Sequence, residues 1–187
     1  MKKNRINYLI VLLACFLLFA FATVKSKEMR SDTQATILNT ATPPDSANPY
    51  TIIIDKSDYE LKVYDEEGWL ATYPVVFGSK NLGDKMKRGD KLTPDGEFKV
   101  ILKKKNPKWG DELLLDYPNK ESYRRFNERK KKGLLPKNAD IGDGIAIHAT
   151  RPNEEWTIDS YYSWTDGCIS LKYTEMKDLY SYIPVGT

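Results

Sequence analysis

The chain has 187 residues, with 29 Lys and Arg against 26 Asp and Glu and a formal net charge of +3. Six of the basic residues and one of the acidic residues lie within the first 31, so the remainder carries 23 − 25 = −2. A near-neutral remainder gives no electrostatic case for binding nucleic acid and excludes that class of partner.

The first 24 residues have the pattern of an export signal or membrane anchor. A basic start precedes an apolar stretch over residues 8–24. The length of this stretch is at the lower limit for a helix that spans a membrane. Residues 20–22 (Ala-Phe-Ala) resemble a cleavage site, and residues 12–15 resemble a lipoprotein signal. The sequence leaves open whether this segment is cleaved, retained or lipidated. We expect the rest of the chain to be exported to the periplasm or cell envelope, touching the membrane only through this segment.

Two further regions follow. Residues 25–48 are rich in Ser, Thr, Ala, Pro and Asp without a sustained period, which predicts a flexible linker. Residues 49–187 remain as one domain, large enough to bury its own core, and they contain no internal repeat.

The first half of this domain predicts a β-hairpin and a loop. Residues 52–54 open a strand, and residues 59–63 alternate apolar with charged side chains as a second strand does. A turn at residues 66–68 returns the chain through residues 70–77. Residues 78–90 then form a polar, glycine-containing loop.

The second half adds further short strands and one or two peripheral helices. A turn at residues 93–96 leads into alternation over residues 98–102, with apolar Phe98, Val100 and Leu102 on one side. Asn119 can cap a helix that Gly133 stops. Many short strands with few helices predict an α+β fold that is mostly β. The remaining predicted elements are strands at 113–115, 145–148 and 168–171 and a helix at 174–182.

One histidine and one cysteine are the candidate reactive residues of the domain. His148 is the only histidine of the chain, and Cys168 follows it by 168 − 148 = 20 residues. The other cysteine, Cys15, lies in the apolar N-terminal segment. Because a thiol is mostly neutral at pH 7, it needs a base or a positive neighbour to become nucleophilic. Any thiol chemistry of the domain therefore falls to Cys168 as nucleophile and His148 as base.

Gly167 adds a second chemical feature. A glycine before the nucleophile permits a tight turn and the close approach of a substrate carbonyl. The backbone N–H groups of Gly167 and Cys168 are then candidates for an oxyanion hole. The alternative is a buried structural cysteine beside a strand-end histidine, and the residues by themselves leave both interpretations open.

In their order and spacing, these segments resemble the L,D-transpeptidase catalytic domain family. The resemblance covers nearly all of residues 49–187. It implies a mixed-β fold, peptidoglycan stem peptides as substrate, and neither cofactor nor metal. The motifs that carry it are Ile147-His148, Trp164-Thr165-Asp166-Gly167-Cys168, Thr93-Pro94-Asp95-Gly96-Glu97-Phe98 and Leu115-Asp116-Tyr117-Pro118-Asn119.

The resemblance also implies a reaction. Cys168 would attack the carbonyl of the third residue of a stem tetrapeptide, D-Ala would leave, and a thioester would remain, with His148 as general base. An amine of a second stem peptide, or of a wall-linked protein, would resolve the thioester. Water in place of the amine would make the protein a carboxypeptidase or amidase.

Two departures from the family pattern bear on the site. Asp166 stands where the family usually has a second histidine; it either orients His148 as the third group of a triad or only shapes the turn. Ser170 stands where many members have arginine, which leaves Arg151 as the candidate for binding a substrate carboxylate. The predicted substrate-binding residues are therefore Arg151, Trp164, Thr165 and Ser170.

Two alternatives lie outside this chemistry. One is a non-catalytic wall-binding module that kept the fold, although the presence of both His148 and Cys168 argues against it. The other is a zinc site formed by His148, Cys168 and Asp166. The sequence shows no paired ligand spacing that would favour a metal.

Overall fold

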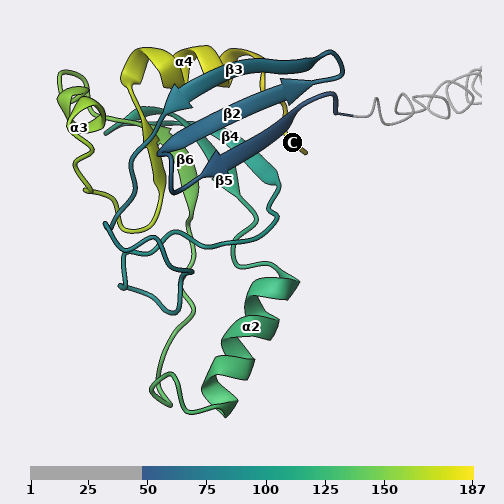
Figure 1. Ribbon diagram of the computed structural model, residues 1–187, viewed down its shortest axis with the longest axis vertical. Helices are drawn as coiled ribbons and strands as arrows, with labels where there is room; N and C mark the ends of the chain where they lie inside the picture. Colours follow the sequence, from purple (N-terminus) through teal and green to yellow (C-terminus); the bar gives the residue numbers. More distant parts are fainter. Residues whose placement is uncertain (1–47) are drawn as a thin grey trace, which may run out of the picture. The chain divides into compact units, whose positions relative to one another are not determined.

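The computed structural model describes residues 48–187, so the predicted signal segment and nearly all of the predicted linker lie outside the described residues. The described part forms two sheets in the orders β1-β2-β3 and β4-β5-β6-β7 (Figure 1). The predicted α+β, mostly β class is confirmed. The elements are β1 (Thr51–Asp55), β2 (Glu60–Asp65), β3 (Gly68–Pro74), β4 (Val100–Asn106), β5 (Gly110–Leu115), α2 (Lys120–Lys131), β6 (Ala146–Ala149), α3 (Trp156–Asp159), β7 (Ile169–Leu171) and α4 (Tyr173–Tyr182).

The first sheet is the predicted hairpin with one more strand, all antiparallel. In β2, Leu61 and Val63 are fully buried between partly exposed charged residues, which is the alternation of a half-buried strand. β3 ends at Pro74, earlier than the predicted end at residue 77, because proline has no N–H to continue the ladder. Val76 instead bridges to Ser170 of the second sheet.

The second sheet carries the parallel pair on which the site depends. β4, β5 and β6 are antiparallel neighbours, whereas β7 runs parallel to β6 and pairs His148 with Ser170. A parallel pair needs a crossover connection. Here the crossover contains α3, a single-turn helix too short to give a periodic signal in the sequence.

One predicted position in β4 is wrong. Leu102 was expected to face inward with Val100, but it is 46% exposed, whereas Val100 is buried. The pairing register shifts between these two residues, so the alternation predicted from residue 98 onward is broken there. A bulge of this kind moves every later side chain to the other face.

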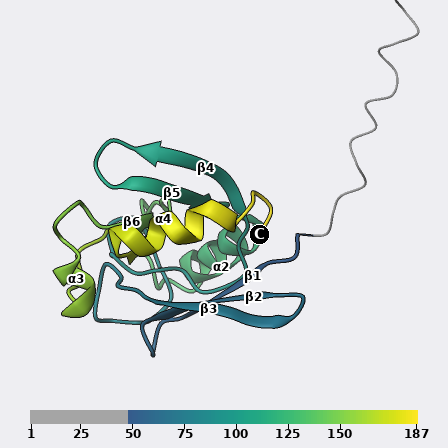
Figure 2. The ribbon, with the colours of Figure 1, turned by 90° about the horizontal axis from the view of Figure 1, so that it is seen from above.

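The core lies between the two sheets and under α4. Met176 and Leu179 of α4 are fully buried, and the helix packs against β5 and β6. The hydroxyl of Tyr73 on β3 donates to Asp178 of α4 at 2.6 Å, so the helix also contacts the first sheet (Figure 2). The other buried apolar residues of the core include Leu61, Val63, Phe77, Leu113, Ile147, Ile169 and Leu171.

α2 confirms the predicted cap and lies below the two sheets in Figure 1. The side chain of Asn119 accepts a hydrogen bond from the amide of Ser122 at 3.0 Å, and Gly133 follows the helix with φ +71°. Together with α3 and α4, the described residues contain three helices, whereas the sequence predicted one or two. None of them is long and apolar enough to cross a membrane.

Candidate active site

His148 is held in a defined tautomer. It lies on β6, is 4% exposed, and faces Glu112 of β5 on one side and Ser170 of β7 on the other. Its Nδ1 is 2.8 Å from the carbonyl oxygen of Ala149. Because a carbonyl oxygen can only accept, Nδ1 carries the proton and Nε2 keeps a free lone pair. The imidazole is therefore arranged as a base through Nε2.

Two indole rings enclose this imidazole. Trp109 stacks on it with ring centroids 5.2 Å apart, and Trp164 meets it edge-on at 5.4 Å. Burial lowers the pKa of His148 below its ordinary value of 6.5, and the contact with Ala149 and the charge of Glu112 oppose this only in part. His148 is consequently neutral at pH 7.

Cys168 lies directly before β7, and its Sγ is 3.5 Å from the carbonyl oxygen of Gly144. Burial raises the pKa of this thiol, and the negative charges of Glu112 and Asp166 raise it further. The backbone N–H of Ala146 and the amine of Lys85 act in the opposite direction but do not reverse the shift. At rest, Cys168 is therefore a neutral thiol.

The sheet sets the spacing between Cys168 and His148. His148 pairs with Ser170, so Cys168 lies two residues back along the neighbouring parallel strand, on the same face as Ser170. A strand separation of about 4.8 Å and a rise of about 3.3 Å per residue put the two Cα atoms about 8 Å apart. Diagonal neighbours at this separation are within reach of each other's side chains.

The turn before the nucleophile is built around Gly167. Its φ is +119°, and a Cβ atom at this position would lie 2.6 Å from the carbonyl oxygen of Leu92, so only glycine fits. The amide of Gly167 donates to the hydroxyl of Thr165 at 3.2 Å, and that hydroxyl donates to the Cys168 carbonyl at 2.7 Å. The Gly167 amide is thus engaged within the turn, which leaves the Cys168 amide as the predicted oxyanion donor.

Other predicted site residues are dispersed. Asp166 is exposed and makes no hydrogen bond or ion pair with any residue in 48–187; the Nδ1 it was to orient contacts Ala149 instead. An orienting role for Asp166 stays a prediction. Arg151 is exposed and pairs with Glu154 at 3.2 Å. Ser170 is fully buried beside His148.

Unsatisfied polar atoms surround the imidazole. The Ser170 hydroxyl, the Thr150 hydroxyl and the Trp164 indole nitrogen are buried, and none has a hydrogen-bond partner in the described part of the chain. Buried polar groups ordinarily have partners, so a group without one marks a place where water or a ligand atom binds. Thr150 directly follows β6, Ser170 lies on β7, and Trp164 lies in the loop that leads to Cys168.

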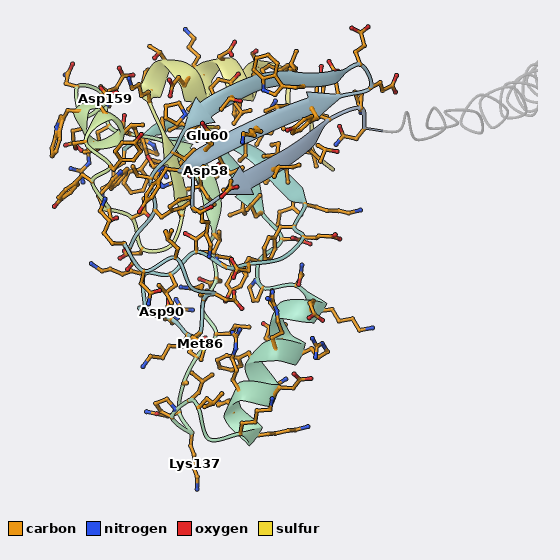
Figure 3. The ribbon with its side chains drawn as sticks, viewed as in Figure 1. Asp58, Glu60, Met86, Asp90, Lys137 and Asp159 are labelled. Carbon is orange, nitrogen blue, oxygen red and sulfur yellow. The ribbon has the colours of Figure 1, made fainter. Side chains whose placement is uncertain are left out.

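The segment of residues 78–93 packs directly on the catalytic turn. The hydroxyl of Thr93 donates to the carbonyl of Gly167 at 2.9 Å. Lys85, which is 5% exposed, pairs with Asp90 at 2.9 Å. Figure 3 shows Met86 and Asp90 between the sheets and α2, and Arg125 of that helix pairs with Asp84. The segment is therefore fastened at both the turn and α2.

Two residues that lie near His148 were not predicted from the sequence. Trp109 lies in the turn between β4 and β5, where an aromatic residue next to Gly110 was the available signal. Glu112 is 6% exposed and bonded to Lys104 and Asn106. Nothing in the sequence indicated that β5 would bring this carboxylate beside the imidazole.

The large cavity of the domain does not open on the reacting groups. It has a volume of about 890 Å³ and lies between β1 and residues 93–98. Ile147 and Ile169 line it, and these residues alternate with His148 and Cys168 along β6 and β7, so the cavity faces the opposite side of the sheet. Within residues 48–187, no three His, Cys, Asp or Glu side chains gather as a metal site would require.

Residues 49–187 match the sequence model of the YkuD L,D-transpeptidase catalytic domain. A curated relative, "Putative L,D-transpeptidase YqjB" of Bacillus subtilis (strain 168), is 28% identical over 148 residues, 77% of this chain and 71% of that protein.

Two solved structures are similar at lower sequence identity. Bd1075 of Bdellovibrio bacteriovorus superposes with a TM-score of 0.52 at 22% identity, over 74% of this chain and 45% of that one. The L,D-transpeptidase (Yku) of Stackebrandtia nassauensis gives 0.48 at 13% identity, over 75% and 54%. This chain spans about half the length of these solved proteins.

Proposed function

The chain belongs to the L,D-transpeptidase catalytic domain family, and on that premise we propose that it performs L,D-transpeptidation on peptidoglycan stem peptides. The observation that carries the proposal is the placement of one imidazole and one thiol by a parallel strand pair: His148 lies on β6, and Cys168 directly precedes the neighbouring strand β7. The substrate puts the activity in the cell envelope. The fate of the N-terminal segment does not enter the reaction.

In the first half-reaction the two neutral groups exchange one proton. The Nε2 of His148 takes the thiol proton as the Sγ of Cys168 bonds to the carbonyl carbon of the third stem residue. The amide of Cys168 stabilises the resulting oxyanion. The C–N bond to D-Ala then breaks, Nε2 gives its proton to the leaving amine, and a thioester remains.

In the second half-reaction an amine of another stem peptide attacks the thioester. Nε2 takes a proton from this amine, the new C–N bond forms, the C–S bond breaks, and the proton returns to Sγ. An amine of a wall-linked protein satisfies the same chemistry. Water in place of the amine gives a carboxypeptidase or amidase by the same steps, which is the second candidate.

The neutral resting pair suits an exported enzyme. Thiolates are the species that oxidants attack, and oxidation of an exposed thiolate outside the cytoplasm would end the activity. Burial holds the pKa of the Cys168 thiol above its ordinary value. The thiolate therefore forms only when His148 takes the proton in the presence of substrate.

The test uses the full chain incubated with a disaccharide tetrapeptide, with products identified by mass spectrometry. Cys168→Ala should abolish turnover and the single covalent adduct that a carbapenem forms with the wild type. His148→Ala should lower turnover at least about a hundredfold. Cys15→Ala is the control and should leave both unchanged. Full turnover by Cys168→Ala, or an adduct mapped to another residue, contradicts the proposal.

A further inference from the structure

The helix α3 lies at one corner of the domain (Figure 1), and exposed aromatic side chains come from α3 and the residues that follow it. Trp156, Tyr161 and Tyr162, which we name the aromatic corner, are 56%, 49% and 53% exposed. The rings of Trp156 and Tyr162 are tilted, with centroids 5.5 Å apart. Large aromatic side chains gathered on a surface mark interaction sites more often than isolated ones do.

The aromatic corner is held rigidly by the structure below it. The amides of Tyr161 and Tyr162 donate to the carbonyls of Ile158 and Thr157 at 3.0 and 2.8 Å, and those two residues are buried. Tyr161 adopts φ +52° and meets the ring of Tyr59 edge-on at 5.3 Å. Binding to a surface that is already ordered costs little conformational entropy.

Several of the charges around the aromatic corner have partners. Arg151 pairs with Glu154 at 3.2 Å, and Lys172 pairs at 2.5 Å with Asp159, which Figure 3 labels on α3. Glu155 accepts hydrogen bonds from the amide and hydroxyl of Thr174. The amine of Lys80 donates to the carbonyl of Tyr161 and lies 5.4 Å from the ring centroid of Tyr59. Exposed rings dominate the surface, which matches a ligand that has apolar faces.

The aromatic corner lies within reach of the reacting thiol. Six residues separate Tyr162 from Cys168 and span at most about 20 Å. The same stretch contains Trp164, which contacts His148. The three stem residues between a sugar and the carbonyl that Cys168 attacks extend about 10 Å. A sugar chain attached to a bound stem peptide can therefore reach this surface.

We propose that the aromatic corner binds the glycan strand of peptidoglycan, with the pyranose rings stacked on Trp156 and Tyr162. This inference rests on the proposed function, because that function supplies the stem peptide that brings the strand to this face. N-acetylated amino sugars are neutral, and their C–H faces meet the negative faces of aromatic rings favourably. The corner thus recognises the polymer, and the groups around Cys168 recognise the peptide.

The first arm of the test measures binding without turnover. Oligomers of N-acetylglucosamine, which are neutral, are titrated into the full chain by calorimetry. Trp156→Ala and Tyr162→Ala should each weaken binding about tenfold, whereas Trp69→Ala, at a tryptophan of β3 that is 64% exposed, should not. High salt should leave the affinity unchanged, because the probe carries no charge.

The second arm compares substrates. The two corner variants should raise KM about tenfold for polymeric peptidoglycan and leave kcat and KM for a free tetrapeptide unchanged. Wild-type KM for the polymer in both corner variants, or an equal rise in Trp69→Ala, overturns the inference, and so does a rise for the free tetrapeptide. Loss of all turnover with glycan binding intact counts against the proposed function alone. Thermal unfolding of each variant verifies that the fold is kept.

Discussion

At the scale of single residues, charge near Cys168 sets when its thiol reacts. Asp166 is exposed and raises the pKa of this thiol after burial and Glu112. Asp166→Asn removes one negative charge and keeps the turn, since Asn supports the same geometry. The pKa of Cys168 should therefore fall, and alkylation by iodoacetamide should become faster at neutral pH. Asp58→Asn, at another exposed aspartate, serves as the control, and superimposable alkylation curves would refute the effect.

The same variant decides whether Asp166 orients His148. The acylation rate measured against pH reports the coupled titration of the thiol and the imidazole. A shift limited to the alkaline limb is expected from the thiol alone. A loss of rate at every pH would instead support the triad role, in which the carboxylate stabilises the imidazolium.

Trp109 offers a second prediction at this scale. Its ring covers His148, and burial is the main reason that the pKa of this imidazole is lowered. Trp109→Leu should admit water, so the pKa should rise toward 6.5 and the acid limb of the acylation profile should move to higher pH. Because the chain has a single histidine, its proton resonance reports the titration directly. Trp69→Leu should leave the resonance unchanged.

The sequence indicates the candidate pair, Cys168 and His148, but not its surroundings. Cys168 and His148 follow from the scarcity of their residue types. Trp109 and Glu112 reach His148 only because β5 pairs with β6 in one register, with Glu112 opposite His148. That register depends on side chains far apart in the chain, so no local pattern near residue 148 contains it.

At the scale of elements, the segment 78–93 is a part of the site although it contains no predicted reacting group. A Cβ atom on Gly78 would lie 2.6 Å from the Lys91 carbonyl oxygen and 2.8 Å from the Gly167 amide nitrogen. Gly78→Ala should therefore cost about 1–3 kcal/mol of unfolding free energy, as overpacking does, and should slow acylation by displacing the turn.

Urea unfolding and burst acylation measure these two effects. Gly83→Ala is the matched control, because it lies in the same segment and its added methyl would meet only the side chain of Asn81, at 3.2 Å. Equal stability and equal acylation in the two variants would mean that the backbone around residue 78 shifts to accommodate the added methyl group. The Gly167 turn would then be held by its own hydrogen bonds.

Elements with strong local signals were predictable. Alternation gave the hairpin strands, and the Asn119 cap gave α2. The direction of β7 relative to β6 was not predictable, because both strands are short and buried on both faces, so neither carries an alternation. α3 is a single turn, and the bulge near Leu102 arises from pairing with β5.

At the scale of the whole molecule, the buried histidine links stability to pH. Burial lowers the pKa of His148 in the folded state, so the unfolded chain takes up a proton first, near pH 6.5. Stability should be complete above that pH and should decline as the pH falls toward the folded-state pKa, by at most about 1.4 kcal/mol per pH unit.

The free energy of unfolding, measured in urea between pH 5.5 and neutrality as a rough working window, tests this. His148→Asn removes the titrating group and should flatten the curve. The remaining slope reports carboxyl groups such as Glu175, whose pKa burial raises. Parallel curves for the two proteins would mean that the folded state protonates His148 as readily as the unfolded chain does.

The parallel pairing of β6 and β7 has a consequence for how such a domain diversifies. The ladder fixes His148 opposite Ser170, and Cys168 directly precedes β7, so the length and composition of the crossover do not alter how these residues are placed. The crossover is also where the aromatic corner lies. Exchanging residues 152–162 for another loop should change which polymer is bound, while the reaction stays the same. Variation among descendants of one ancestral enzyme is expected to collect in this stretch.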